Sequence, residues 1–275
     1  MSIQAKRRAS QTAIILVMLI VCVVFILPYV WMLLNSFKPQ AEIMRGKTFL
    51  PAKFTWGNYV TVWTKAPILA WFRNSLVTTA CGTVILLFTS TIAGFVFGKY
   101  QFKGKDILFW FILATMMVPV QTTMIPSFLL VEKLGLYDKL AALVIPRMVG
   151  GFGIFLCRQF IEDIPDSLCE AACIDGAGDF FIYRRVILPL ILPAISALAI
   201  FTFLECWNDY LGPLLYLSEP KNMTMPLALS FFSNQHSANI GAIMAAATLI
   251  MLPVTIVFLS CQKQFIEGIA ITGIK

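Results

Sequence analysis

Charged residues are scarce in this sequence of 275 residues: they make up 13% of it, while hydrophobic residues make up 59%. Soluble domains contain about 25% charged and about 45–50% apolar residues. The mean hydropathy is accordingly high, at +0.83. So little polar surface could not cover a water-soluble globule, and the composition excludes that class of protein.

The residues of most catalytic and metal sites are also rare. The sequence has one histidine, His236, which falls in a loop between apolar runs. Cys169 and Cys173 are four residues apart, but a structural zinc site needs four such ligands. An intramembrane enzyme would need a nucleophile–base pair or metal ligands within its spans. We therefore expect no catalytic residue, no metal site and no disulfide in this chain.

A phosphate-binding loop is missing as well. Gly150, Gly151 and Gly153 are followed by Ile154, where a P-loop would continue with lysine and then serine or threonine. We therefore expect this chain to bind neither ATP nor any other cofactor. The net charge of +7 does not predict a nucleic-acid partner, because the basic residues sit in short connectors where anionic lipid headgroups are the simpler contact.

Long runs without a charged residue are abundant in this sequence. An α-helix needs about 20 apolar residues to cross the hydrocarbon core of a membrane. Three runs exceed that length: Ala13–Leu34, Asn74–Gly98 and Ile107–Val131. Three further runs are less regular: Leu140–Cys157, Val186–Leu204 and Asn239–Cys261. The sequence thus predicts an all-α, polytopic integral membrane protein with six transmembrane helices in one domain over residues 1–275.

Lysine and arginine placement indicates the orientation. With the N-terminus inside, the inner segments hold eleven of these residues and the outer segments nine. The margin is small, but the cluster Lys6-Arg7-Arg8 before the first span favours this arrangement. The expected segments are a cytoplasmic N-terminal tail (1–12), an external loop (35–73), a cytoplasmic loop (158–185) and a cytoplasmic C-terminal tail (262–275).

The cytoplasmic loop has an organised sequence. Pro165 ends the preceding helix, and Ser167 with Glu170 fits the S-x-x-E capping box at the start of a short helix. Gly176 and Gly178 are expected to provide a left-handed exit from that helix. A second helical stretch should run from about Phe180 and break at Pro189, with Pro193 adding to the kink. From the residues alone, an amphipathic segment on the membrane surface remains an alternative.

The order Glu170-Ala171-Ala172, Asp175-Gly176-Ala177 and Leu188-Pro189 resembles the EAA loop of ABC importer permeases. Other segments are similar to the carbohydrate permeases of the maltose/maltodextrin type within that family. These segments are Asn35-Ser36-Phe37-Lys38-Pro39, Trp56-Gly57-Asn58-Tyr59, Phe72-Arg73-Asn74-Ser75-Leu76, Pro119 to Pro126, Trp207-Asn208-Asp209-Tyr210, Thr224-Met225-Pro226-Leu227 and Lys263-Gln264-Phe265-Ile266-Glu267-Gly268. The resemblance covers nearly the whole chain.

This resemblance implies a type I ABC importer permease fold in the inner membrane, with the EAA loop as a coupling helix. It implies one half of a sugar or polyol pathway and four kinds of partner: a second, related permease, two cytoplasmic ATPase subunits that bind ATP and Mg²⁺, an extracytoplasmic solute-binding protein, and membrane lipid. The chain itself would be a transport subunit and not an enzyme. The resemblance does not identify the sugar.

The resemblance also implies roles for residues of the loop. Glu170 would pair with a basic side chain of the ATPase, Ala171 and Ala172 would allow close packing, and Gly176 would provide the turn. Asp175 and Ala177 belong to the same docking set: Glu170, Ala171, Ala172, Asp175, Gly176 and Ala177. Arg184 and Arg185 have two interpretations, contact with the ATPase or with anionic lipid.

Polar residues inside the spans are candidates for the pathway, because they are costly in the membrane. Gln121, Thr122 and Thr123 could contact a sugar, or could instead form hydrogen bonds between helices near the prolines. Asn208 and Asp209 match a family motif and are candidate lining residues.

The neighbouring Glu205 and Tyr210 have an alternative position at the outer membrane edge, with Trp207 as an interfacial anchor. Arg147 departs from the family pattern. It could snorkel to the membrane surface or pair with an acid of the partner permease.

A secondary transporter driven by an ion gradient is the competing function. Such a protein would need intramembrane acids or broken helices at corresponding positions of two repeats. Glu205 and Asp209 form the one acidic cluster of this kind in the sequence, and no inverted repeat is evident.

Overall fold

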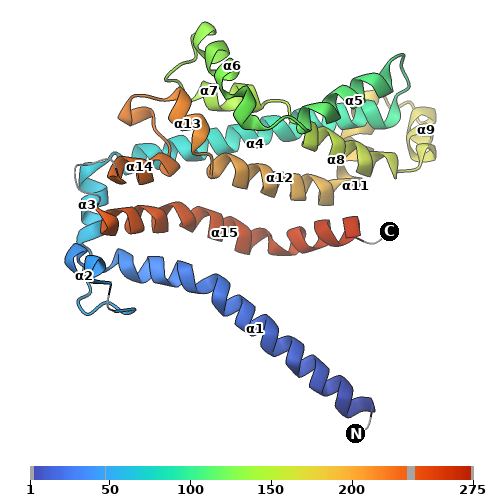
Figure 1. The fold of residues 1–275 in the computed structure, drawn as a ribbon. Coiled ribbons are helices and arrows are strands. Elements are labelled where there is room, and N and C mark those ends of the chain that lie inside the picture. Colours follow the sequence, from blue (N-terminus) through green and yellow to red (C-terminus); the bar gives the residue numbers. More distant parts are fainter. Residues whose placement is uncertain (1–2, 47, 234–238, 274–275) are drawn as a thin grey trace. The chain divides into compact units, whose positions relative to one another are not determined.

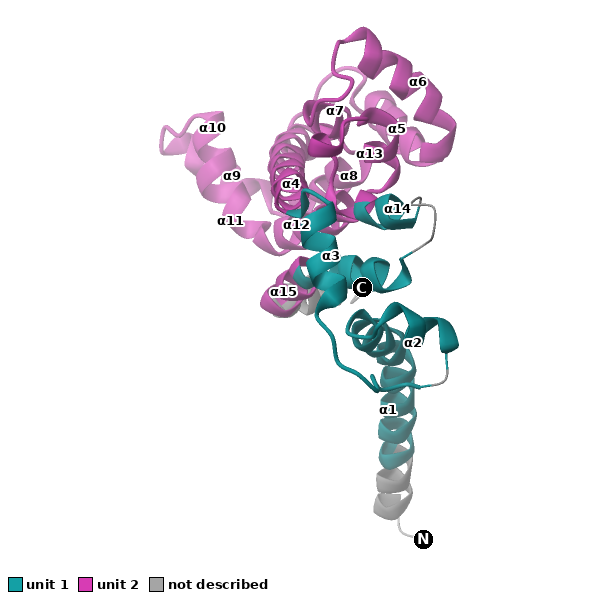
Figure 2. Cartoon of the chain, turned by 90° about the vertical axis from the view of Figure 1, so that its left-hand side faces the viewer, with its two compact units in different colours: residues 1–68, 228–252 teal, residues 69–227, 253–275 magenta. Residues whose placement is uncertain are grey.

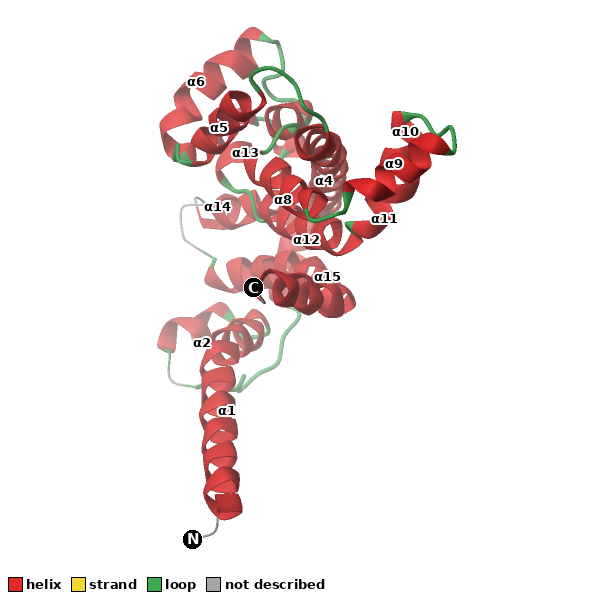
Figure 3. Cartoon of the chain, turned by 90° about the vertical axis from the view of Figure 1, so that its right-hand side faces the viewer, coloured by secondary structure: helices red, strands yellow, loops and turns green. Residues whose placement is uncertain are grey.

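The computed structural model describes residues 3–46, 48–233 and 239–273, and these parts of the chain form helices and loops without a strand (Figures 1 and 3). The helices in chain order are α1 (Ile3–Ser36), α2 (Gln40–Arg45), α3 (Gly57–Lys65), α4 (Ile68–Lys99), α5 (Lys105–Met116), α6 (Val120–Lys133), α7 (Ala141–Val144), η1 (Ile145–Arg147), α8 (Gly151–Glu162), α9 (Asp166–Ile174), α10 (Asp179–Ile182), η2 (Tyr183–Ile187), α11 (Leu188–Leu190), α12 (Leu192–Trp207), α13 (Leu211–Tyr216), η3 (Pro220–Asn222), η4 (Met225–Leu227), α14 (Ala228–Ser233) and α15 (Ile240–Gly273).

The chain forms two compact units, which Figure 2 shows in different colours. Unit 1 comprises residues 1–68 and 228–252, and unit 2 comprises residues 69–227 and 253–275. The long helix α15 therefore contributes to both units. Both candidate sites described below lie within unit 2.

Among the described residues, three helices are long and apolar enough to cross a membrane, and the number is six if each of three bent helix pairs is one span. The continuous spans are Gln11–Ser36, Ile68–Lys99 and Ile240–Cys261. The other three are pairs of helices that pass the length and hydropathy requirements only together. Their bends are 101° between α5 and α6, 44° between α7–η1 and α8, and 79° between the α10–α11 segment and α12.

Proline and glycine account for the positions of these breaks. Pro119 precedes α6 in an extended conformation, and a proline both lacks an N–H and disfavours helix in the residue before it. Gly150 is extended where α8 begins. Pro126, by contrast, lies inside α6. The residues predicted to kink the third span therefore act differently: one ends a helix and the other is accommodated in it.

The predicted break at Pro189 is wrong by two residues. The helical segment that begins at Asp179 continues through Pro189 and ends at Leu190, and Ile191 leaves the helical conformation before Pro193 in the first turn of α12. The preceding turn, η2, is a π-helix. A wider turn at this point relieves the clash between a proline ring and the carbonyl group one turn earlier.

The connectors also differ from the expected loops. The predicted external loop, 35–73, contains α2 and α3, and α4 already begins at Ile68. Where tails were expected, 1–12 and 262–275, the backbone of α1 begins at Ile3 and that of α15 continues to Gly273. Hydropathy marks the apolar part of a helix, and helices here extend beyond it into polar sequence.

Within unit 1, buried polar groups join two of the sequence motifs. The Asn58 side-chain amide donates hydrogen bonds of 2.8 Å to the carbonyl groups of Ser36 and Lys38. The hydroxyl groups of Ser36 and Tyr59 are 2.8 Å apart. A buried carbonyl group without a partner is costly, so these contacts stabilise the end of α1 against the start of α3.

Within unit 2, a second pair of motifs meets in the same way. The Asn74 amide donates to the carbonyl groups of Lys221, at 2.9 Å, and Met223, at 3.0 Å. The backbone N–H of Met225 donates to the Ser75 hydroxyl at 2.8 Å. The loop after α13 is thereby attached to the first turns of α4.

Two glycines of α4 allow a close approach to α8. A Cβ atom on Gly94 would lie 2.5 Å from the Cβ of Cys157, and one on Gly98 would lie 2.8 Å from Cγ2 of Ile161. Gly94 and Gly98 have the spacing of the G-x-x-x-G packing motif of membrane helices. Cys157 and Ile161 are fully buried and belong to a core cluster that also includes Phe95, Tyr183 and Ile187.

Candidate functional site

The predicted coupling helix is α9, which lies at one end of unit 2 (Figure 1). It begins at Asp166, after Pro165, and no side-chain capping bond forms there. The predicted capping box of Ser167 and Glu170 is therefore wrong, because Ser167 already lies within the first turn. The carboxylate of Asp166 instead accepts a hydrogen bond from Lys99, at 2.6 Å.

The end of α9 follows the expected pattern at one glycine and not at the other. Gly176 has a φ of 82°, as predicted for a left-handed exit. The N–H of Ala177 donates to the carbonyl group of Ala172 at 2.9 Å, which satisfies a free acceptor at the end of the helix. Gly178 has a φ of −78° and leads into α10. The prediction of a left-handed Gly178 is therefore wrong.

The faces of α9 differ in exposure. Glu170, Ala171 and Asp175 are exposed, whereas Ala172 and Ala177 are half-buried and pack against the core cluster beneath. Small size at Ala172 thus serves packing within this chain in addition to any contact outside it. Burial also raises the pKa of the Cys169 thiol, which packs against the same cluster.

Apolar side chains surround the exposed carboxylates. Ile174, at the end of α9, is 86% exposed, and Leu168 and Phe180 are also exposed. Arg184 and Arg185 are exposed on the π turn that follows α10. Several exposed apolar side chains bordered by charged ones are a feature of protein-interaction surfaces, whereas one such side chain alone would not be.

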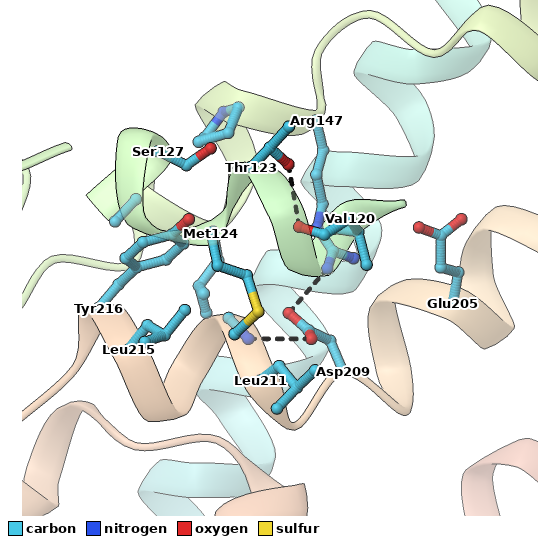
Figure 4. Close-up of a pocket in the computed structure, with 14 residues that line it drawn as sticks. Val120, Thr123, Met124, Ser127, Arg147, Glu205, Asp209, Leu211, Leu215 and Tyr216 are labelled. Carbon is cyan, nitrogen blue, oxygen red and sulfur yellow. Dashed lines mark hydrogen bonds and ion pairs between the residues drawn. The ribbon is translucent and has the colours of Figure 1, made fainter. Parts of the chain in front are cut away.

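A pocket of about 430 Å³ lies between the bent third, fourth and fifth spans (Figure 4). It is lined by Val120, Thr123, Met124, Ser127, Ala142, Leu143, Pro146, Arg147, Glu205, Asp209, Leu211, Gly212, Leu215 and Tyr216. Of the predicted pathway residues, Thr123 and Asp209 belong to this lining, whereas Gln121, Thr122 and Asn208 do not.

The hydroxyl groups near Pro119 bond within their own helix. Thr122 donates to the carbonyl group of Pro119 at 2.7 Å, and Thr123 donates to that of Val120 at 2.9 Å. The Asn208 amide likewise donates to the carbonyl group of Leu204 at 2.9 Å. The threonine hydroxyl groups therefore do not form the hydrogen bonds between helices that one interpretation of Thr122 and Thr123 proposed, and contact with a sugar stays a prediction.

Two of the lining residues, Arg147 and Asp209, form an ion pair. Arg147 Nη2 lies 2.8 Å from Asp209 Oδ2, and Arg147 Nη1 lies 3.6 Å from the sulfur of Cys206. The other carboxylate oxygen of Asp209 accepts a hydrogen bond of 3.1 Å from the N–H of Gly212 (Figure 4). The acid that pairs with Arg147 is thus in the same chain, and not in a partner permease as one interpretation proposed.

Two neighbours of Asp209 are placed differently from expectation. Glu205 lines the pocket, where its carboxylate faces the same space as the ion pair. Trp207 is fully buried, with its ring stacked on Phe203 and edge-on to Phe72. An interfacial anchor must reach the headgroup region, so that interpretation is wrong for Trp207.

Neither site has a metal-binding arrangement. Among the described residues, no group of three or more histidine, cysteine or acidic side chains is placed to hold a metal ion. All seven cysteines are free thiols. His236, predicted as a loop residue, lies outside the described residues.

Comparison with known proteins identifies a family. Residues 90–270 match the family described as "Binding-protein-dependent transport system inner membrane component". The chain is similar to the arabinooligosaccharides transport system permease protein AraQ of Bacillus subtilis (strain 168), with 33% identity over 96% of this chain and 95% of the relative. It is also similar to the lactose transport system permease protein LacG of Rhizobium radiobacter, with 31% identity over 88% of this chain and 89% of the relative.

Solved structures share the fold. A chain of a bacterial ABC transporter involved in the import of the acidic polysaccharide alginate has a TM-score of 0.84 and 24% identity, over 96% of this chain and 99% of that chain. A chain of a bacterial alginate ABC transporter in complex with an alginate pentasaccharide-bound periplasmic protein has a TM-score of 0.66 and 14% identity, over 93% and 94% of the two chains. The predicted type I permease fold is confirmed.

Replacement of Arg147 by methionine tests the ion pair. We expect Arg147→Met to lower the melting temperature of the purified protein, because the Asp209 carboxylate loses its partner in a largely buried position. Breaking a fully buried pair costs about 3–5 kcal/mol. Arg147 keeps 29% exposure, so a loss on the order of 2–3 kcal/mol is expected here.

The double variant Arg147→Met/Asp209→Asn should recover most of the lost stability, because no charge then remains unpaired. Glu205→Gln is the matched control, since it removes a charge from the same pocket without breaking the ion pair. A melting temperature for Arg147→Met equal to that of Glu205→Gln would contradict the assigned role of the pair.

Proposed function

The chain belongs to the family of inner membrane components of binding-protein-dependent transport systems, and from this we propose that it is the permease subunit of an ATP-driven importer of neutral sugars. Two relatives at more than 30% identity are named for arabinooligosaccharides and lactose. The charge of the pocket supports a neutral substrate: Arg147 is paired with Asp209, which leaves the negative charge of Glu205 to disfavour an anionic sugar.

The transporter would contain this permease, a second related permease, two cytoplasmic ATPase subunits and an extracytoplasmic binding protein. ATP and Mg²⁺ would be bound by the ATPase subunits, in agreement with the absence of a P-loop here. The N-terminus, α9 and the C-terminus would face the cytoplasm. Closure and reopening of the ATPase subunits would shift the permeases between inward-open and outward-open states.

The surface of α9 supports its assignment as the coupling helix. Glu170 and Asp175 are exposed acids, and the small Ala171 is exposed as well. Ile174, the residue before Asp175, is also exposed. A basic groove with an apolar floor on an ATPase subunit would complement this surface. The half-buried side of α9 rests on a buried core, so that a force applied to its outer face would be transmitted and not absorbed by a flexible loop.

The pocket of unit 2 supports a place on the sugar pathway. Thr123, Ser127 and Tyr216 carry hydroxyl groups, and Met124 and Leu215 give apolar surface. Sugar sites combine such hydrogen-bonding groups with apolar surface. The lining of this pocket does not include Gln121, Thr122 and Asn208. These three residues stay candidate lining residues for another conformational state of the transporter.

ATP dependence tests the proposed function. In proteoliposomes with the complete transporter, uptake of labelled arabinotriose or lactose should require ATP at constant membrane potential. Glu170→Lys should reduce that uptake at least about tenfold at unchanged subunit levels, because it reverses the charge that faces the ATPase. Asp106→Lys, at another exposed acid, should leave uptake near the wild-type level.

Two outcomes would count against this assignment. Uptake that follows an ion gradient without ATP would favour a secondary transporter, for which Glu205 in the pocket would be the candidate ion site. ATP-driven uptake that survives in Glu170→Lys would remove α9 from the docking surface.

Labelling of cysteines tests the orientation. Cys173 on α9 is exposed, and in a variant without the other cysteines a membrane-impermeant maleimide should label it only in inside-out vesicles. Lys65→Cys, at the exposed end of α3, should react only in right-side-out vesicles or cells. Labelling of Cys173 from the outside would overturn the topology.

Filling the pocket tests its place on the pathway. Ser127→Trp would put an indole ring into the pocket, and we expect a fall in the uptake rate of at least about fivefold, since the lining leaves no room for both ring and sugar. Leu129→Trp is the matched control, because Leu129 is 57% exposed on the same helix and does not line the pocket. Equal uptake rates in the two variants would place the pathway elsewhere.

A further inference from the structure

The end of α4 makes an unusual polar contact with the start of the α9 segment. Lys99, the last residue of α4, donates from Nζ to Asp166 Oδ1 at 2.6 Å and also to the carbonyl group of Ile164. The Lys99 side chain is only 8% exposed, whereas that of Asp166 is 77% exposed. A buried ammonium group must be paired and hydrogen-bonded, and both partners of Lys99 lie just before or in the first turn of α9.

The adjacent residue contacts the other side of α9. Tyr100 follows Lys99 directly, and Asp179, the first residue of α10, lies near enough to act on its hydroxyl group. Burial, followed by hydrogen bonding to Asp179 and the charge of that carboxylate, raises the pKa of Tyr100 to about 12. The hydroxyl group therefore stays protonated at neutral pH as a donor toward the carboxylate. The Tyr100 ring packs edge-on against the buried Phe95.

We propose that Lys99 and Tyr100 clamp the segments before and after α9 to the end of α4, and thereby transmit the movement of the ATPase subunits into α4. We call this pair of contacts the α4 clamp. The inference rests on the proposed function, because it assumes that α9 receives the force of the ATPase. Lys99 and Tyr100 are positioning residues in this role, since they act through α9.

The packing of α4 on α8 shows how the force would spread. The covalent chain connects α9 to α8 on one side and to α10 on the other, and not to α4. The α4 clamp adds a direct polar connection to α4, beside the apolar packing that α9 and Phe95 of α4 share in the core cluster. Gly94 and Gly98 then bring α4 into close contact with Cys157 and Ile161 of α8, so that α4 and α8 would move together.

The exposure of Asp166 indicates that the α4 clamp positions α9 and contributes little to the free energy of unfolding. Lys99 lowers the pKa of Asp166 by its hydrogen bond and its charge, so the acid is ionised at neutral pH. Ion pairs with an exposed partner contribute about 0–1 kcal/mol. Loss of the clamp should therefore change how α9 is held without unfolding the protein.

The coupling ratio of the complete transporter tests the α4 clamp. The measurement is the number of arabinotriose or lactose molecules imported per ATP hydrolysed in proteoliposomes, together with the melting temperature. We expect Lys99→Met to lower the ratio several-fold at nearly unchanged melting temperature, because ATP hydrolysis continues while α4 no longer follows α9. Lys99→Arg should retain most of the coupling, since it keeps the charge and the donors.

Two conservative variants make the test independent of how well Lys99→Met folds. Asp166→Asn and Tyr100→Phe each remove one clamp contact at almost unchanged shape, and each should lower the ratio. Lys99→Met/Asp166→Asn should be no worse than the more severe single variant, because both changes remove the same contact. Lys103→Met, at an exposed lysine beyond the clamp, is the matched control and should keep the wild-type ratio.

The result that overturns the clamp differs from the result that overturns the proposed function. Suppose that wild-type uptake is coupled to ATP. If the single variant Tyr100→Phe and one of the single variants Lys99→Met and Asp166→Asn then keep the wild-type ratio, the clamp is wrong and the proposed function stands. If wild-type uptake does not depend on ATP, the proposed function itself fails.

Discussion

Unpaired backbone groups and charges are costly in the hydrocarbon core of a membrane, and three candidate spans of this chain are pairs of helices separated by a bend. Polar side chains lie near these bends. Asp209 accepts from the N–H of Gly212, one of the N–H groups left free in the first turn of α13, and the hydroxyl groups of Thr122 and Thr123 bond to carbonyl groups at the start of α6. The pocket of unit 2 forms between these breaks, so the same irregularity that costs backbone hydrogen bonds also creates a polar space.

The two candidate sites lie near different ends of α4, which is an unbroken span. Near its start, Asn74 and Ser75 hold the loop that follows α13. At its end, Lys99 holds the segment of α9. A helix rises about 1.5 Å per residue, so α4 is a rigid element of roughly 48 Å between the pocket end and the α9 end. A movement of α9 that reaches α4 could therefore alter the loops beside the pocket directly.

Comparison of sequence and structure shows which kinds of inference were dependable. Charge-free length predicted the spans, and Pro165 with Gly176 correctly placed a short helix at α9, within two residues of its ends. The errors concern local details that depend on neighbours. Ser167 does not cap the helix because α9 already begins at Asp166, and Trp207 is buried because Phe203 and Phe72 pack against it. The G-x-x-x-G spacing of Gly94 and Gly98 was a readable signal for helix packing that the sequence analysis did not use.

The sequence by itself determined the class of the protein, the number of its spans and the position of its coupling segment, because these depend on composition and on patterns within one stretch of chain. Only the tertiary structure decided the partners of the charged residues. Arg147 meets Asp209, and Lys99 meets Asp166, across more than sixty residues of sequence. No local pattern encodes such pairs, since a charge in a span is satisfied by whichever acid the packing of the helices brings within reach.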